Sequence, residues 1–155
     1  MPDCFISYSS SDERLARTMA GLLAARDVSV FLACISIQPG AHWSEETLRN
    51  LQESPWVVFL ASREAAASSY VNQELGVALG MGKKIIPIVW DMPPSELPGW
   101  MNQIQAIDLR ERVWPDIPIE IIEQISMAIK ADKLPGELIV GALLFGLIWL
   151  SNKFK

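Results

Sequence analysis

Apolar runs typical of buried strands alternate along this sequence with segments that have the periodicity of helices. We expect strands at residues 4–8, 28–32, 56–61, 83–90 and 104–109. We expect helices over residues 9–27 and 44–53, from residue 68 up to the strand at 83, and over 117–131. Because the predicted strands are apolar throughout, the pattern favours a parallel sheet covered by helices on both faces.

The ends of the predicted strands indicate where a ligand would bind. In a parallel sheet of this kind, ligands bind outside the carboxyl ends of the strands, where the helices begin. We expect that edge to gather residues 7–12, the loop 33–43, the segment 62–70 and the loop 91–101. Pro87 stands inside the fourth predicted strand, and because proline has no backbone N–H, we do not expect that strand to pair fully.

Composition limits the classes to which the chain can belong. Its 155 residues, half of them apolar and a fifth charged, suit one globular domain with a proper core. A net charge of −5 without a long lysine or arginine cluster speaks against nucleic acid as a partner. Cys4 and Cys34 lie on or beside predicted strands, and without a secretory signal we expect a reduced, cytoplasmic setting. One histidine and two cysteines without ligand spacing predict no metal site.

The residues at the ends of the predicted strands exclude three classes of protein that are built on such sheets. The turn SYSSSDE (7–13) has no glycine and does not form a phosphate-binding loop. The third strand runs into FLASRE (59–64), without the aspartate that a phospho-acceptor receiver domain needs. Ser-His-Asp hydrolysis would need His42, and the sequence has no glycine-flanked serine as a nucleophile.

The predicted helix before the fourth strand carries a carboxylate at an unusual place. Four apolar residues repeat at helical spacing and predict a core-facing stripe: Val71, Leu75, Ala78 and Leu79. Glu74 lies on neither this stripe nor the polar side, which includes Asn72. It belongs to a flank that it shares with Tyr70, Val77 and Met81. A charged residue beside a core stripe commonly extends its head into solvent, and this is the alternative to a role in a site.

Three segments, in order along the chain, resemble the conserved boxes of Toll/interleukin-1 receptor (TIR) domains. DCFISYSSSDE (3–13) resembles the first box, and VFLACISIQPGAHWSEE (30–46) resembles the second, with its Pro-Gly pair before a tryptophan. The stretch from VVFLAS to YVNQELGVAL (57–79) resembles the strand and helix that bear the family's functional glutamate. The resemblance covers nearly all of residues 1–131. It implies a flavodoxin-like three-layer α/β fold with a five-stranded parallel sheet.

The resemblance also implies a catalytic role for Glu74. In TIR domains that cleave nicotinamide adenine dinucleotide (NAD), a glutamate four residues after an aromatic residue, usually tryptophan, contacts the ribose next to nicotinamide. Here Tyr70 takes the place of that tryptophan and Glu74 the place of the glutamate. Residues four apart share a helix face, so an aromatic wall and a carboxylate would line one cleft. The carboxylate would stabilise the oxocarbenium character of the ribose, with NAD as substrate and no cofactor.

Two loops supply the remaining binding residues that the resemblance implies. The residues after the first predicted strand, where a nucleotide would lie, are Ser7, Tyr8, Ser9 and Asp12. The loop that covers the NAD cleft in this family and packs against the next protomer contains Pro39, Gly40 and Trp43. The alternatives are structural, because such residues are often helix caps, turns or loop anchors. The packing implies that activity depends on a homo-oligomer or filament.

A second feature lies outside the resemblance. After a linker at residues 132–137, the segment 138–152 begins with a long apolar run and predicts a hydrophobic helix. That run would rise only about 20 Å, short of the roughly 30 Å hydrocarbon core of a bilayer. Three interpretations stay open for it: membrane association, packing in an oligomer, or folding onto its own domain.

Two classes of function therefore stay open, with a third more distant. The first is an NAD-cleaving hydrolase or cyclase in a prokaryotic defence or signalling system, activated by self-assembly. The second is a non-catalytic TIR scaffold or adaptor that acts through TIR–TIR contacts. Glu74 distinguishes these two, because a scaffold needs no carboxylate in the cleft. The third is a nucleoside deoxyribosyltransferase-like enzyme, against which QPGAHW (38–43) speaks.

Overall fold

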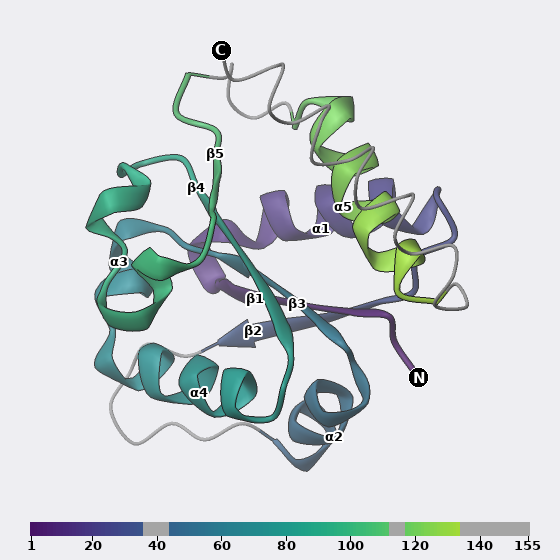
Figure 1. Cartoon of the computed structure of the whole chain (residues 1–155), viewed down its shortest axis with the longest axis horizontal. Coiled ribbons are helices and arrows are strands. Elements are labelled where there is room, and N and C mark those ends of the chain that lie inside the picture. The colour runs from purple at the N-terminus through teal and green to yellow at the C-terminus, as the bar shows by residue number, and fades with distance from the viewer. Residues whose placement is uncertain (36–43, 112–116, 134–155) are drawn as a thin grey trace.

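The computed structural model describes residues 1–35, 44–111 and 117–133, and it describes Ile35, Tyr70 and Glu74 by their backbone alone. The strands in these residues are β1 (Cys4–Ser9), β2 (Val30–Ile35), β3 (Trp56–Leu60), β4 (Lys84–Val89) and β5 (Ile107–Asp108). The α-helices are α1 (Glu13–Ala24), α2 (Glu45–Glu53), α3 (Arg63–Ala67), α4 (Ser69–Gly80) and α5 (Ile119–Ala131). Three short 3-10 helices are η1 (Ser10–Asp12), η2 (Pro94–Glu96) and η3 (Gly99–Gln103). Figure 1 shows the strands at the centre, with the helices around them.

The strands form one parallel sheet in the order β2-β1-β3-β4-β5. This arrangement confirms the predicted five-stranded parallel sheet. The chain runs outward from β1 to β2 on one side and from β3 to β5 on the other, so the strand order reverses between β1 and β3. In sheets of this order, the carboxyl edge beside the reversal is where ligands bind.

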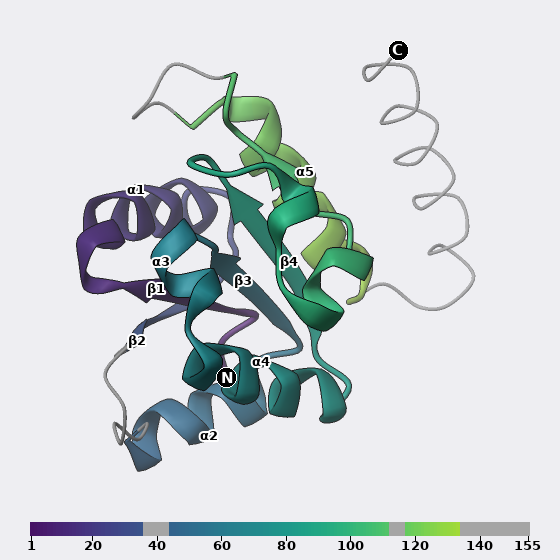
Figure 2. The ribbon, with the colours of Figure 1, turned by 90° about the vertical axis from the view of Figure 1, so that its left-hand side faces the viewer.

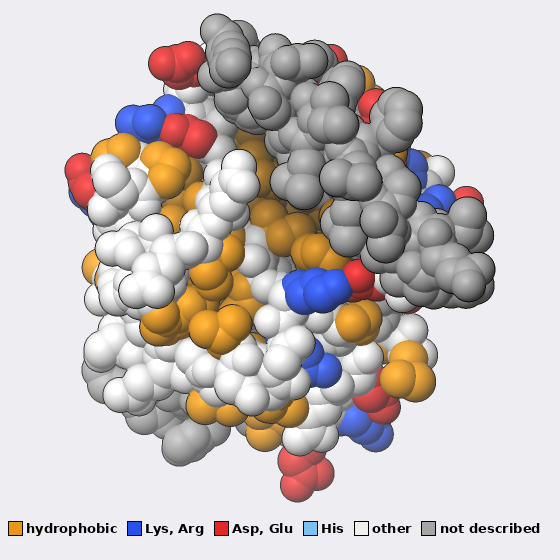
Figure 3. Space-filling view, viewed as in Figure 1, with side chains coloured by type: hydrophobic (Ala, Val, Ile, Leu, Met, Phe, Trp, Pro, Cys, Tyr) orange, Lys and Arg blue, Asp and Glu red, His pale blue; other side chains and the backbone are white. Residues whose placement is uncertain are grey.

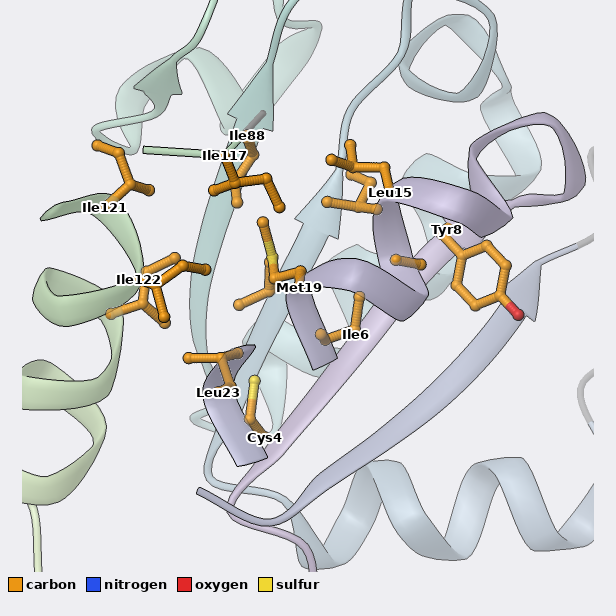
Figure 4. Packing of buried hydrophobic residues seen from close by; sticks show 14 of the residues in the cluster. Cys4, Ile6, Tyr8, Leu15, Met19, Leu23, Ile88, Ile117, Ile121 and Ile122 are labelled. Atoms are coloured by element: carbon orange, nitrogen blue, oxygen red, sulfur yellow. The ribbon is translucent and has the colours of Figure 1, made fainter. Parts of the chain in front are cut away.

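Helices cover both faces of the sheet and give the three layers that the sequence predicted (Figure 2). On one face, α1 and α5 pack on the sheet through buried residues that include Leu15, Ile122 and Ile88 (Figure 4). On the other face, α2, α3 and α4 enclose a second cluster that includes Leu51 and Leu75. Successive strand residues point alternately into these two clusters, which explains why the strands are apolar throughout.

Two strands differ from their predicted extents by more than one residue at an end. The strand predicted at 28–32 is β2, which ends three residues later because Ala33, Cys34 and Ile35 pair with the last three residues of β1. β5 has two residues where the sequence predicted a strand at 104–109, because only Ile107 and Asp108 pair with β4. A sequence pattern records apolar residues, whereas a strand also requires a paired neighbour.

The helices also differ in detail from the prediction. α1 starts only at Glu13, because the three residues before it form η1. Before α4 the structure has the additional short helix α3, which Ser62 caps by accepting a hydrogen bond from Ala65 N at 3.3 Å. In α4, three residues of the predicted stripe are buried, but Leu79 is 41% exposed and its assignment was wrong. α4 contacts the core through a narrow stripe, and the residue after Ala78 lies beyond its edge.

Polar side chains tie the end of α5 to the amino edge of the sheet, where the strands begin. Asp132, directly after α5, accepts a hydrogen bond from Trp56 Nε1 at 2.7 Å and pairs with Lys84 Nζ at 2.5 Å. Trp56 opens β3 and Lys84 opens β4. Lys133 pairs with Asp3, just before β1, at 2.7 Å. The last described residues are therefore fixed at the amino edge.

Partly buried hydrophobic residues of β4 and β5 pack against the core on the α1 and α5 side: Ile86 and Ile107. Figure 3 shows hydrophobic side chains at the surface in the middle of the face that carries β4.

Within the described ranges, no helix is long and apolar enough to cross a membrane. The predicted helix at 138–152 lies outside the described residues.

Candidate functional site

β1 brings a buried serine to the carboxyl edge of the sheet. Since Tyr8 belongs to the cluster under α1, Ser7 points to the opposite face, which α2, α3 and α4 cover. Ser7 lies opposite Phe59 of β3 and is fully buried. Its Oγ has no hydrogen-bond partner in the part of the chain that the structure describes. A buried hydroxyl without a partner destabilises a fold by about 1–3 kcal/mol, so this position invites a functional explanation.

Tyr8 lies on the other face of the sheet. Figure 4 shows its ring beside α1, with the hydroxyl group at the outer end of the cluster. Burial raises the pKa of the Tyr8 phenol, and the nearby Cys34 and Glu13 act in the same direction. The structure therefore separates Tyr8 from Ser7, and a role for Tyr8 in binding stays a prediction.

Ser9 and Asp12 form a hydrogen-bonded turn between β1 and α1. Ser9 Oγ donates to Asp12 Oδ2 at 2.6 Å and lies 2.9 Å from Ser11 Oγ. Among the described residues, the Asp12 carboxylate accepts no capping bond from α1. Asp12 therefore orients the loop, and the Ser9 hydroxyl is already engaged, unlike that of Ser7. Ligand contact by either residue stays a prediction.

Helices α3 and α4 follow β3 and start at the same edge of the sheet. A single residue, Ser68, joins them, and its Oγ caps α4 by accepting a hydrogen bond from Val71 N at 3.4 Å. Tyr70 and Glu74 both lie in the first half of α4, four residues apart. Positions with this spacing share one helix face. Glu74 lies beyond the first turn, so the helix dipole does little to stabilise its charge.

A polar network that the sequence pattern did not indicate lies at the corner between α3 and α4. Asn72, which the sequence assigned to the polar side, is half-buried, and its Nδ2 donates to the carbonyl oxygens of Ala66 at 2.8 Å and Ser68 at 2.9 Å. Asp91, two residues after the end of β4, accepts hydrogen bonds from Arg63 N at 2.9 and 3.1 Å. Asp91 could have been found from the sequence, because it is a carboxylate just past the carboxyl end of a predicted strand, where sites of this fold form.

The predicted loop residues Pro39, Gly40 and Trp43 lie outside the described residues, so their part in the site stays a prediction. The same holds for the side chains of Tyr70 and Glu74. Within residues 1–35, 44–111 and 117–133, no group of three or more His, Cys, Asp or Glu residues could hold a metal ion.

A family model described as the TIR domain matches residues 4–125. The chain belongs to the TIR domain family. Its structure is similar to the TIR domains of the activated Roq1 resistosome that recognises the pathogen effector XopQ, with a TM-score of 0.63, 19% identity, and coverage of 81% of this chain and 97% of that one. It is also similar to the TIR domain of the Toll-related receptor TRR-2 from Hydra magnipapillata, with a TM-score of 0.63, 19% identity, and coverage of 84% and 99%. At this identity, the similarity shows the TIR fold alone.

A curated relative is BdTIR from Brachypodium distachyon, named a probable 2′ cyclic ADP-D-ribose synthase. This TIR protein is 30% identical to it over 97 residues, which is 61% of this chain and 43% of BdTIR. The chain therefore spans less than half of the length of that relative.

Proposed function

We propose that this TIR protein cleaves NAD at the bond between nicotinamide and ribose. The observation that carries the proposal is the position of Glu74 in α4, four residues after an aromatic residue, on a helix that starts at the carboxyl edge. The name of BdTIR supports it, because a 2′ cyclic ADP-ribose contains ADP-ribose without nicotinamide. As the resemblance implies, we assign the activity to a defence or signalling system of a prokaryote.

One carboxylate suffices for the proposed chemistry. As the bond between the sugar and the ring nitrogen breaks, nicotinamide takes the bonding electrons and positive charge develops on the ribose. The Glu74 carboxylate accepts a hydrogen bond from a ribose hydroxyl and stabilises that charge. Water then attacks the sugar carbon and releases a proton to give ADP-ribose, or a hydroxyl of the same molecule attacks to give a cyclised product.

Ser7 is the second residue that we assign to the substrate. Its hydroxyl lies on the face of the sheet that α4 covers, and it has no hydrogen-bond partner among the described residues. A polar group of the nucleotide that reached Ser7 would remove the free-energy cost of that unpaired hydroxyl. Tyr70 would supply an aromatic face beside Glu74, and Ser9 and Asp12 would shape the loop next to them.

The test is NAD turnover by the full chain, with nicotinamide and the nucleotide product resolved by mass. We expect Glu74→Gln, which keeps the size of the side chain and removes its charge, to lower kcat/KM by about 100-fold or more. Glu120→Gln, the same change at an exposed site on α5, is the matched control and should keep wild-type turnover. Wild-type turnover in Glu74→Gln would exclude Glu74 as the catalytic group.

A non-catalytic scaffold is the second candidate, and one observation favours it. α4 exposes Val77 (60%), and Met81 directly after the helix is also exposed, a surface suited to packing against another protein. In the enzymatic case, TIR–TIR contacts complete the cleft, so turnover per protomer should rise with protein concentration. Assembly seen by sedimentation, without NAD turnover at any concentration, would favour the scaffold.

A further inference from the structure

The corner between α3 and α4 is held by more hydrogen bonds than its helix caps require. Ser62 caps α3 and Ser68 caps α4, so each helix already has a side-chain cap. Asn72 adds two further bonds, from one amide nitrogen to the carbonyl oxygens of Ala66 and Ser68. These bonds join the end of α3 to the second turn of α4. They fix the angle between the helices rather than the existence of either one.

The same corner is attached to the chain that follows β4. Both carboxylate oxygens of Asp91 accept from Arg63 N, at 2.9 and 3.1 Å. Arg63 Nη1 pairs with Glu96 at 2.5 Å, and Arg63 Nη2 donates to the Asp91 carbonyl oxygen at 3.3 Å. Residues 91–96, which follow β4, thus bind the first residue of α3. Asp91 lies 28 residues after Arg63 in the sequence.

Apolar contacts from the same segment support α4. Leu97 and Met101 are buried in one cluster with Leu75, which lies next to Glu74 along the helix. A methyl group added at Gly76 would lie 3.5 Å from Trp100 Nε1, so this indole sits directly against α4. The chain from residue 91 to 101 therefore contacts both α3 and α4.

We propose that Asn72 is a positioning residue for the catalytic face of α4, together with Asp91, Arg63 and Glu96. Asn72 holds the first half of α4 against α3, and the other three hold α3 against the end of β4. The position of Glu74 relative to the substrate then depends on the loop after β4, although none of these four residues touches the reacting atoms. The effect on catalysis rests on the proposed NAD cleavage, whereas the holding of α3 and α4 rests on the contacts alone.

The test compares Asn72→Asp with Gln73→Glu in the full chain. Asn72→Asp keeps the size of the side chain but replaces the donor with an oxygen that repels both carbonyl groups. Gln73→Glu makes the same amide-to-carboxylate change at the adjacent exposed position and serves as the matched control. Asp91→Asn weakens the attachment of α3 at its other end. Each variant is measured in two experiments. The first is amide hydrogen exchange along α3 and α4, and the second is the kinetics of NAD turnover, which gives kcat and KM.

We expect Asn72→Asp to speed amide exchange in α3 and the first half of α4, while exchange in β1 and β3 stays at wild-type rates. We expect kcat to fall about 10-fold or more, because a displacement of the catalytic group by about 1 Å can cost 100-fold in rate. We expect KM to rise as well, because Glu74 also binds the ribose in the proposed mechanism. A variant that is only less stable would instead keep the wild-type KM and recover its kcat on cooling. Asp91→Asn should shift both measurements in the same direction, and Gln73→Glu neither.

The exchange measurement separates this inference from the proposed function. Faster exchange confined to α3 and α4, in a protein whose wild type does not turn over NAD, would overturn the proposed function and leave the network established as a structural clamp. Wild-type exchange and kinetics in Asn72→Asp would overturn the positioning role itself. A recovery of kcat on cooling, with KM unchanged, would also overturn it.

Discussion

The amino and carboxyl edges of the sheet differ in how completely their polar groups are paired. At the amino edge, Asp132 is bound by Trp56 and Lys84, and Lys133 pairs with Asp3. At the carboxyl edge, Ser7 is fully buried with no hydrogen-bond partner in the described chain. Both edges belong to one sheet with one core, so the contrast reflects different demands. The amino edge is built for stability, whereas the carboxyl edge keeps a feature that lowers stability unless a ligand satisfies it.

The largest effect that would sharpen this contrast is expected at the amino edge. Asp132→Ala removes the acceptor of Trp56 Nε1 and the partner of Lys84. We expect a loss of about 1–2 kcal/mol in the free energy of unfolding, the lower part of the range applying because Lys84 is half-exposed. Urea denaturation measures it, and NAD turnover at 25 °C should not change. A fall in turnover without a loss of stability would show that the edges are not functionally separate.

Ser7→Ala should have a smaller effect of the opposite sign on stability. The substitution removes an unpaired buried hydroxyl, so we expect the free energy of unfolding to rise by about 1 kcal/mol. If Ser7 contacts the nucleotide, the KM for NAD should rise in the same variant. Thermal unfolding and turnover test the two parts together. A destabilised variant with an unchanged KM would mean that the hydroxyl serves the fold and not a ligand.

The smallest effect concerns the pH dependence of the amino edge. Burial favours the neutral form of Asp3, but hydrogen bonds from Lys133 and Ser29 outweigh it and lower the pKa of this carboxyl. A lowered pKa in the folded state contributes stability that is present above the unfolded value, near 3.9, and is lost as the pH falls through the folded value. Asp3→Asn should therefore be less stable than wild type at pH 7, by less than about 1 kcal/mol. In urea titrations the gap should narrow below pH 4, and a gap that widened in acid would contradict this origin.

The sheet and its layers could be predicted because their signals are local. A continuous apolar run indicates a buried strand whatever its neighbours are, and a serine directly before a helix, as at Ser44 and Ser68, is a preferred cap. α3 escaped prediction because its five residues are too few to show a helical period. The length of β5 depends on pairing with β4, which the strand's own residues do not encode.

The sequence was enough to place the candidate site at the carboxyl edge of the sheet, but not to predict the contacts between its residues. Strand polarity alone gathers residues 7–12, 62–70 and 91–101, and the structure joins the last two through Asp91 and Arg63. The bond between those residues, and the missing partner of Ser7, depend on side-chain positions far apart in sequence. Asn72 illustrates the limit, because helical periodicity placed it in solvent while the bend at Ser68 brings two carbonyl groups to its amide.

The ties around Asp132 and Lys133 also determine how the domain would bear mechanical load. A force applied beyond Lys133 would enter the sheet at the starts of β1, β3 and β4 together, through Asp3, Trp56 and Lys84. These contacts lie at the starts of three adjacent strands and not at one alone. A surface linkage or fusion partner attached after Lys133 would therefore hold the domain by its amino edge. The carboxyl edge lies at the opposite end of every strand, away from that attachment.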